Sequence, residues 1–207
     1  MSETVLRAEH LTKIFRVRGK EDFRAVDQVS FSLKKGETLG LIGESGCGKS
    51  TLAKLLCRLI DPSEGTIELC GRDITAVKGK ELREAYQNIQ MVFQDPVSSF
   101  DPRKTLGDGI GESLRNQGLS AAETKSKVQD LLKRCDLPGD FAGRYPYEVS
   151  GGQCQRAAIA RALAIEPQVL ICDEATSALD VTVQKKIMEL LTGLRDQSKI
   201  ANIFICH

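Results

Sequence analysis

Residues 43–50 combine glycines with a lysine and a serine at a spacing suited to binding phosphate. The stretch reads Gly43-Glu44-Ser45-Gly46-Cys47-Gly48-Lys49-Ser50 and fits the pattern G-x-x-x-x-G-K-[ST]. Glycines let successive backbone N–H groups point at phosphate oxygens, and the start of a following helix adds partial positive charge. In such a loop the ammonium of Lys49 contacts the β- and γ-phosphates of a nucleotide, and the hydroxyl of Ser50 ligates Mg²⁺.

The flanking residues supply the strand and the helix that this chemistry needs. Residues 38–42 form a short apolar run after a turn-like Lys35-Gly36, which predicts a buried strand. The pattern of residues 49–56 predicts a helix, which ends near Asp61-Pro62. A chance glycine-rich turn is the alternative interpretation, and the order strand, loop, helix argues against it.

A pair of acids follows a second buried strand. The apolar residues 169–172 precede Asp173 and Glu174, which places both carboxylates at the carboxyl edge of a parallel sheet, beside the phosphate loop. We assign Asp173 to Mg²⁺ and Glu174 to polarising the attacking water as a general base. Without other motifs, such a pair would be interpreted as two solvated acids that end a strand. The phosphate loop upstream favours the interpretation that the pair is catalytic.

The remaining sequence alternates between strand and helix patterns. Strands are predicted within residues 5–42 and at 66–70, 89–93 and 203–206. A short helix is predicted around 79–86, mostly helical structure over 102–148, and longer helices from 150 to 165 and from 181 to 195. Ser120 and Glu123 form a capping-box pattern, and the helix that they start has one apolar face. That face consists of Val128, Leu131, Leu132 and Cys135. The fold class is therefore α/β.

Composition excludes several classes of protein. The 29 basic and 28 acidic residues give a net charge of +1, so the overall charge gives no reason to expect a nucleic-acid partner. Seven scattered cysteines, an odd number without C-x-x-C spacing, argue against a disulfide framework or a zinc site and fit a reducing cytosol. The N-terminus has no signal-peptide pattern, and no apolar run approaches the ~18 residues of a membrane helix. If the protein moves solutes, other chains form the pore.

The segment Val149-Ser150-Gly151-Gly152-Gln153 resembles the Leu-Ser-Gly-Gly-Gln signature of the ABC ATPase family, and it follows the phosphate loop at about the family's distance. A serine N-cap and two glycines at a helix start offer N–H groups and close approach to an anion. Without the family, the same residues would be interpreted as a capping turn. The resemblance implies that this segment contacts the γ-phosphate held by the opposite subunit of a head-to-tail dimer.

Other family landmarks occur in the same order. By resemblance, Phe15 stacks on adenine, Gln94 contacts Mg²⁺ and the attacking water, Asp180 lies in a dimer-interface loop, and His207 is a switch histidine near the γ-phosphate. Outside this series a phenylalanine near a strand end is usually core, and a glutamine before Asp-Pro is usually a turn residue. The expected ATP-binding residues are Phe15, Gly43, Glu44, Ser45, Gly46, Cys47, Gly48, Lys49, Ser50 and Thr51. The expected catalytic residues are Gln94, Glu174 and His207, and the expected Mg²⁺ ligands are Ser50, Gln94 and Asp173.

A finer similarity is to the oligopeptide, dipeptide and nickel importer branch of the family. It rests on residues 91–103, on residues 43–48 and on Tyr145-Pro146. The resemblance implies ATP-driven uptake of peptides or nickel at the cytoplasmic face of the membrane. The implied partners are a second ATPase subunit, transmembrane permease subunits and an extracytoplasmic substrate-binding protein. An exporter motor, a soluble non-transport ABC ATPase and a regulatory subunit without useful hydrolysis are the alternatives.

The resemblance also sets the expected architecture. We expect a P-loop NTPase core over residues 1–96 and 156–207, with an antiparallel β subdomain and an inserted α-helical subdomain at 97–155. All belong to a single ABC ATPase domain, which stops at His207, short of the family's usual extent. On that basis we expect a poorly placed His207 and reduced turnover.

Two departures from the family pattern and one cysteine of the phosphate loop add expectations. Val149 replaces a leucine, and we expect little effect from so small an apolar change. Cys154 stands where an arginine is frequent, and we expect it to remove a charge close to the nucleotide interface. Cys47, near Lys49 and a helix start, is expected to react with thiol reagents unless ATP protects it.

Overall fold

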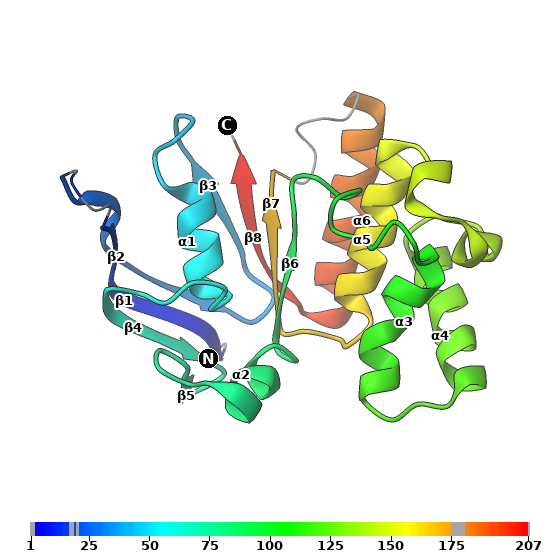
Figure 1. Ribbon diagram of the computed structural model, residues 1–207, viewed down its shortest axis with the longest axis horizontal. Coiled ribbons are helices and arrows are strands. Elements are labelled where there is room, and N and C mark those ends of the chain that lie inside the picture. Colours follow the sequence, from blue (N-terminus) through cyan, green and yellow to red (C-terminus); the bar gives the residue numbers. More distant parts are fainter. Residues whose placement is uncertain (1–2, 17–18, 20, 175–180, 207) are drawn as a thin grey trace. The chain divides into compact units, whose positions relative to one another are not determined.

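The computed structural model describes residues 3–16, 19, 21–174 and 181–206. Its strands are β1 Thr4–Phe15, β2 Phe23–Lys34, β3 Thr38–Ile42, β4 Glu64–Leu69, β5 Arg72–Asp73, β6 Ile89–Val92, β7 Val169–Asp173 and β8 Ala201–Cys206 (Figure 1). Its helices are α1 Lys49–Leu56, α2 Gly79–Ala85, α3 Leu106–Asn116, α4 Ala121–Arg134, α5 Gly151–Leu163 and α6 Val181–Ser198, with 3-10 turns η1 Gly139–Gly143 and η2 Pro146–Glu148.

The chain divides into two compact units. The first consists of residues 1–91, 168–173 and 194–207, and the second of residues 92–167 and 174–193. These units are not the core and helical subdomain that the sequence predicted, and the boundaries of those two parts stay a prediction.

Two kinds of strand pairing occur in the first unit. An antiparallel sheet has the order β2-β1-β4-β5. A second sheet has the order β3-β8-β7-β6, in which β8 pairs in parallel with both β3 and β7. Because parallel neighbours end at the same edge, the residues after β3 and at the end of β7 lie at one edge of this sheet. The sequence prediction of a parallel sheet that carries the phosphate loop is confirmed.

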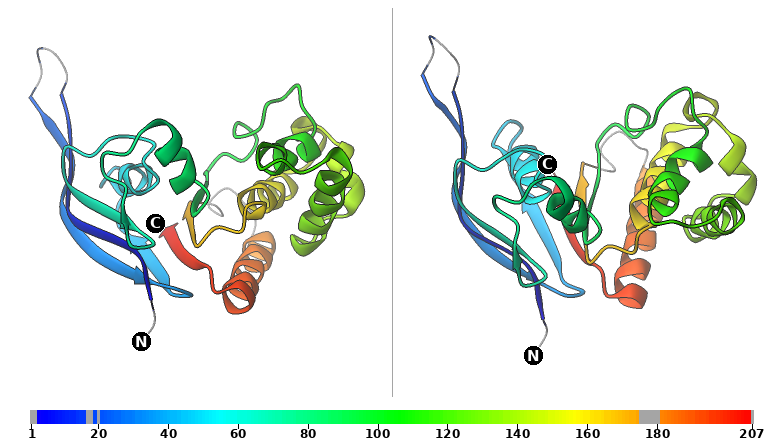
Figure 2. Two further views of the ribbon diagram at one scale, coloured as in Figure 1. Left: turned by 90° about the horizontal axis from the view of Figure 1, so that it is seen from below. Right: turned by 60° about the horizontal axis from the view of Figure 1, so that its bottom comes forward.

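Helix α1 joins the two sheets through one hydrophobic core. It contacts β2 of the antiparallel sheet and β7 of the parallel one (Figure 2). The helix places Leu52, Ala53, Leu55 and Leu56 in the core, each at most 7% exposed. Burial of a leucine side chain stabilises a fold by roughly 1.5–3 kcal/mol. The helix that follows the phosphate loop is therefore fixed by packing on both sides.

The second unit is helical. Helices α3, α4 and α5 contact one another, and η1 packs against α3 and α4. The predicted face of α4 is buried, with Val128, Leu131, Leu132 and Cys135 each at most 6% exposed. The predicted capping box is also present, because the carboxylate of Glu123 accepts a hydrogen bond from the backbone N–H of Ser120 at 2.9 Å. Helix α4 therefore begins where the sequence predicted.

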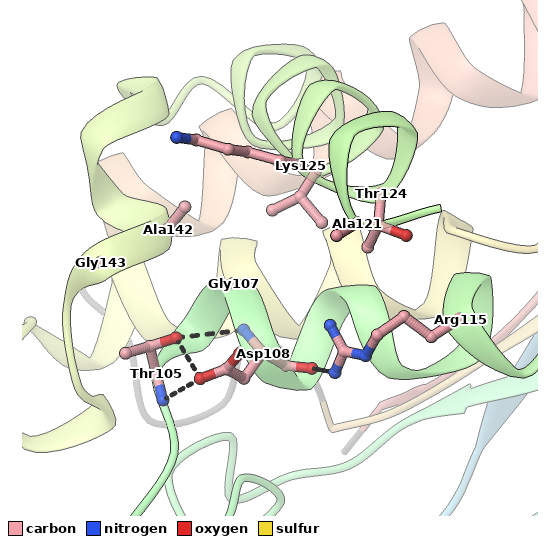
Figure 3. A pocket seen from close by; sticks show the side chains of 10 residues that line it. Thr105, Gly107, Asp108, Arg115, Ala121, Thr124, Lys125, Ala142 and Gly143 are labelled. Carbon is pink, nitrogen blue, oxygen red and sulfur yellow. Dashed lines mark hydrogen bonds between the residues drawn. The ribbon is translucent and has the colours of Figure 1, made fainter. Parts of the chain in front are cut away.

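Helix α3 begins with a second capping box that the sequence analysis did not identify. The hydroxyl of Thr105 accepts a hydrogen bond from the backbone N–H of Asp108 at 3.1 Å, and the Asp108 carboxylate accepts one from the backbone N–H of Thr105 (Figure 3). These residues border a cavity of about 340 Å³ that α3, α4 and η1 line.

None of the helices described here is long and apolar enough to cross a lipid bilayer.

Candidate functional site

The phosphate loop connects β3 to α1 and depends on one glycine. Gly48 is the N-cap of α1 and has a φ of 98°, a left-handed conformation that favours glycine. A Cβ added there would lie 2.0 Å from the carbonyl oxygen of Ala25 in β2. Both the backbone conformation and the close contact with β2 therefore exclude a side chain at this position.

Lys49 lies over this loop. Its ammonium donates hydrogen bonds to the carbonyl oxygens of Gly43 at 2.6 Å and Glu44 at 2.8 Å. The thiol of Cys47 lies 3.9 Å from the same nitrogen. Because carbonyl oxygens are the acceptors in these contacts, an arriving phosphate oxygen can replace them as a stronger, charged acceptor for the ammonium.

Ser50 and Asp173 meet at the edge of the parallel sheet. The hydroxyl of Ser50 donates a hydrogen bond to Oδ1 of Asp173 at 3.0 Å, across 123 positions of sequence. Asp173 is the last residue of β7 and is 7% exposed. The sequence predicted that the carboxylate would lie beside the phosphate loop, and the structure places it there.

This oxygen pair suits magnesium. Mg²⁺ is usually held by one or two protein oxygens together with phosphate oxygens and water, without a cage of protein ligands. The described residues contain no group of three or more His, Cys, Asp or Glu that could hold a metal ion on their own. A hydroxyl and a carboxylate next to a phosphate loop therefore fit Mg²⁺ bound together with a nucleotide.

Gln94 and Glu174, two of the predicted catalytic residues, are in contact within the second unit. The side-chain amide of Gln94 donates a hydrogen bond to Oε2 of Glu174 at 2.6 Å. Glu174 has a φ of 46°, so the chain turns sharply at the end of β7. The amide thus orients the carboxylate that the sequence assigned as general base.

The signature segment forms the start of α5 in the second unit. The hydroxyl of Ser150 accepts a hydrogen bond from the backbone N–H of Gln153 at 3.3 Å, and Oε1 of Gln153 accepts one from the N–H of Ser150 at 2.9 Å. The predicted serine N-cap is confirmed. Gly152 has a packing role that the sequence did not reveal, because an added Cβ would lie 2.7 Å from Cγ1 of Val183 in α6.

Phe15, the predicted adenine-stacking residue, ends β1 with 38% of its surface exposed. It pairs with Phe23 across the antiparallel sheet, and the ammonium of Lys13 lies 5.2 Å from its ring centroid. The ring is thus available for stacking, with a cation already at one side. Asp180 and His207, also expected at the site, lie outside the described residues.

Cys154, expected to remove a charge near the nucleotide interface, is a buried residue of the second unit, and its effect on that interface stays a prediction. Its side chain is 0% exposed, and burial raises the pKa of its thiol to about 11. The residue therefore packs inside the second unit, and its side chain does not stand in for a surface charge.

The sequence analysis missed the residues that support the site. Ala25 restricts Gly48, and Arg161 of α5 binds the segment after Gln94 through Ser99. Ala25 has no signal in a single sequence. Arg161 had one, because it is a charged residue flanked by alanines inside a helix with eight buried residues.

A phosphate loop between a parallel strand and a helix, with an acid at the end of a neighbouring strand, defines the class of P-loop nucleotide-binding proteins. Residues 26–177 match the family model described as ABC transporter. The chain belongs to the ABC transporter family.

Curated relatives support the same family. The chain is 46% identical over 99% of its length to the oligopeptide transport ATP-binding protein AppF of Bacillus subtilis, covering 65% of that protein. It is 48% identical over its whole length to the probable peptide ABC transporter ATP-binding protein y4tS of Sinorhizobium fredii, covering 61% of that protein. It is 44% identical over 99% of its length to the oligopeptide transport ATP-binding protein OppF of Haemophilus influenzae, again covering 65%. The chain thus spans 61–65% of the length of these relatives.

Solved structures confirm the predicted fold class. The ATP-binding cassette MJ0796, described as a dimeric post-hydrolysis state bound to ADP and Pi, superposes with a TM-score of 0.90 at 30% identity. That match covers 98% of this chain and 88% of MJ0796. The protein cbiO1 of Clostridium perfringens, described as part of the ABC transporter complex cbiONQ, gives a TM-score of 0.84 at 28% identity, over 99% of this chain and 79% of cbiO1.

Proposed function

We propose that this chain binds and hydrolyses ATP as a subunit of an ABC importer for oligopeptides or dipeptides. The observation that carries the proposal is the hydrogen bond between Ser50 and Asp173, which puts a hydroxyl and a carboxylate beside the phosphate loop. A bare phosphate-binding loop needs no such pair. A loop that presents nucleotide with Mg²⁺ for hydrolysis does.

The binding step uses the first unit. Backbone N–H groups of residues 43–48 and the N-terminus of α1 bind the phosphates, and Lys49 exchanges its carbonyl partners for phosphate oxygens. Ser50 and Asp173 would hold Mg²⁺, which would neutralise phosphate charge. Phe15 stacks on the base.

The chemical step uses Glu174 and Gln94. The Glu174 carboxylate accepts a proton from water while the water oxygen bonds to the γ-phosphorus and the bond from that phosphorus to the bridging oxygen breaks. The amide of Gln94 holds the carboxylate by the 2.6 Å hydrogen bond. ADP and phosphate leave as products, and no oxidant or further reactant is required.

A second subunit completes the site. In this proposal the signature residues Ser150, Gly151, Gly152 and Gln153 of each subunit contact the γ-phosphate bound by the other. Asp180 belongs to the interface, and His207 contacts the same phosphate. The description of MJ0796 as a dimeric cassette supports this arrangement. The partner is a second ATPase subunit, which is either another copy of this chain or a related one.

The transport role rests on the relatives. Three of them carry names of peptide transport, which supports peptides over nickel as the cargo. The cbiO1 structure is described as part of a transporter complex, which supports binding to permease subunits. We place the chain at the cytoplasmic face of the membrane, together with those permeases and an extracytoplasmic substrate-binding protein.

Phosphate release from Mg-ATP tests the hydrolytic role. We expect Glu174→Gln to lower kcat by roughly 10²–10⁴-fold, the usual contribution of a general base, with ATP binding retained. Glu189→Gln, which removes an exposed carboxylate of α6, is the matched control and should leave kcat unchanged. Equal turnover by the Glu174 variant and the wild type would remove Glu174 from the mechanism.

A further inference from the structure

The segment that carries Gln94 has no regular secondary structure of its own. Residues 93–105 run as turns between β6 and α3. The carboxylate of Asp95 accepts hydrogen bonds from the backbone N–H groups of Val97 at 3.0 Å and Ser98 at 3.2 Å. Those hydrogen bonds, with that of Ser98 the largest cause, hold the pKa of Asp95 below its usual value. The segment is therefore folded locally but needs an external anchor to fix where Gln94 points.

Arg161 of α5 is that anchor. One guanidinium nitrogen donates a short hydrogen bond to the carbonyl oxygen of Ser99, and another donates to its hydroxyl at 3.1 Å. The Ser99 hydroxyl in turn donates to the carbonyl oxygen of Pro96 at 2.7 Å. The rigid fork of an arginine suits such a two-point contact, which a lysine cannot reproduce.

An aromatic ring reinforces the anchor. The guanidinium carbon of Arg161 lies 4.4 Å from the ring centroid of Phe100, a cation–π contact. Phe100 is 5% exposed and also packs on α3, where a Cβ added at Gly109 would lie 2.7 Å from its ring. The segment after Gln94 is thus tied to both α3 and α5 inside one compact unit.

We propose that Arg161 is a positioning residue for Gln94. It fixes residues 95–100 to α5, the helix that is capped by Ser150 and contains Gln153 in its first turn, so that Gln94 and the signature segment move as one body. Through Ser99 and the turn at Pro96 it maintains the 2.6 Å contact between Gln94 and Glu174. Its effect on turnover rests on the proposed function, whereas its effect on the conformation of residues 95–104 does not.

The test compares Arg161→Met with a matched control. Arg144→Met also removes a guanidinium that lies over a phenylalanine ring, that of Phe141 at 3.9 Å, and that bonds a nearby acceptor, the Asp140 carboxylate at 3.2 Å. These two side-chain contacts of Arg144 both lie in η1, outside residues 93–105. Both variants lose the same kind of contact in the same unit, but only Arg161→Met removes the anchor.

Amide hydrogen exchange is the direct readout. The N–H groups of Phe100 and Lys104 donate to Val97 and Asp101 in the wild-type segment. We expect Arg161→Met to accelerate their exchange at least tenfold without changing exchange in α4, and Arg144→Met to leave both amides as in the wild type. In ATP hydrolysis we expect Arg161→Met to lower kcat about tenfold with KM for ATP within twofold, because Lys49 and Ser50 belong to the other unit.

Two milder variants keep the test decisive if Arg161→Met does not fold. Arg161→Lys retains the charge but not the fork, and Ser99→Ala removes one of the two acceptors. We expect each to accelerate exchange at Phe100 by several-fold and less than Arg161→Met. Unchanged exchange in residues 95–104 in all folded variants would overturn the proposal. If the wild type itself does not hydrolyse ATP, the proposed function fails, while the exchange data still decide the role of Arg161.

Discussion

The helices α1 and α5 both begin at a motif expected to bind phosphate, and they begin in different ways. Helix α1 starts at Gly48, which has no side chain with which to cap the helix and is held in a left-handed conformation against β2. Helix α5 starts at Ser150, whose hydroxyl is bonded to the N–H of Gln153 in a reciprocal capping box. No side chain caps the first N–H groups of α1, so they are left for a ligand. In α5 one of these groups, the N–H of Gln153, is already bonded to the Ser150 hydroxyl.

This difference separates a site fixed by tertiary contacts from one fixed locally. The α1 loop depends on the distant residues Ala25 and Asp173, so its geometry requires the whole first unit. The start of α5 needs only residues 150–153 and the packing of Gly152 on α6. We infer that phosphate binds first to the open end of α1, and that α5 contributes when a second subunit approaches.

The largest contrast should appear in thiol labelling, because each region carries one cysteine. Cys47 in the loop is exposed and Cys154 in α5 is buried. With the pKa of Cys154 raised by burial to about 11, only about one thiol in a thousand is ionised at pH 8. We therefore expect N-ethylmaleimide to modify Cys47 at least about 100-fold faster than Cys154 in native protein, because Cys154 is buried and largely un-ionised, and we expect Mg-ATP to slow the reaction of Cys47.

Mass spectrometry of the labelled peptides measures both rates. The exposed residue Cys70 serves as an internal control, whose labelling Mg-ATP should not slow. Similar rates at Cys47 and Cys154 would mean that α5 is not packed as described. Labelling of Cys47 that is indifferent to ATP would separate this residue from the nucleotide.

A second contrast lies within the loop. Gly46 has a φ of 82° with nothing within 4 Å of an added Cβ, whereas Gly48 combines a φ of 98° with the contact to Ala25. Gly46→Ala should cost about 1–2 kcal/mol from backbone strain alone. Gly48→Ala should cost about 3 kcal/mol or more, because β2 or the loop must also move. Urea unfolding measures the difference, and equal costs would show that β2 does not constrain the loop.

The smallest effect distinguishes capping from ligand binding at α5. Ser150→Ala and Ser120→Ala each remove a serine from a capping box, in α5 and α4, and each should cost about 1 kcal/mol of stability. Only Ser150→Ala should also weaken ATP-dependent association of subunits, because α4 carries no motif. Thermal unfolding measures the loss of stability, and sedimentation velocity in the analytical ultracentrifuge measures the association. If the two variants associate equally well with ATP, Ser150 is only a cap.

Local patterns in the sequence predicted most of the fold. The capping box at Ser120, the buried face of α4 and the buried strand before Asp173 all depend on residues within a few positions of one another. The same holds for the phosphate loop, whose strand and helix flank it directly. Such features need no knowledge of tertiary contacts.

The supports of the site could not be predicted, because they join residues far apart in the chain. Arg161 meets Ser99 across 62 positions, and Gly48 meets Ala25 of β2, an element that precedes the loop by the whole of β3. Cys154 directly follows the signature segment, yet the pitch of α5 turns it inward. Resemblance to the family identified the motif, whereas tertiary packing decided which of its neighbours face the interior.

The most direct test of the account is the molar mass of the Glu174→Gln variant in solution, measured by light scattering with and without Mg-ATP. Blocking hydrolysis should trap subunits joined through ATP bound at α1 and the signature of α5, so we predict that Mg-ATP doubles the mass and that adding Ser150→Ala lowers the fraction of protein with the doubled mass. A variant that binds ATP but keeps the monomer mass would contradict a site completed by a second copy of this chain.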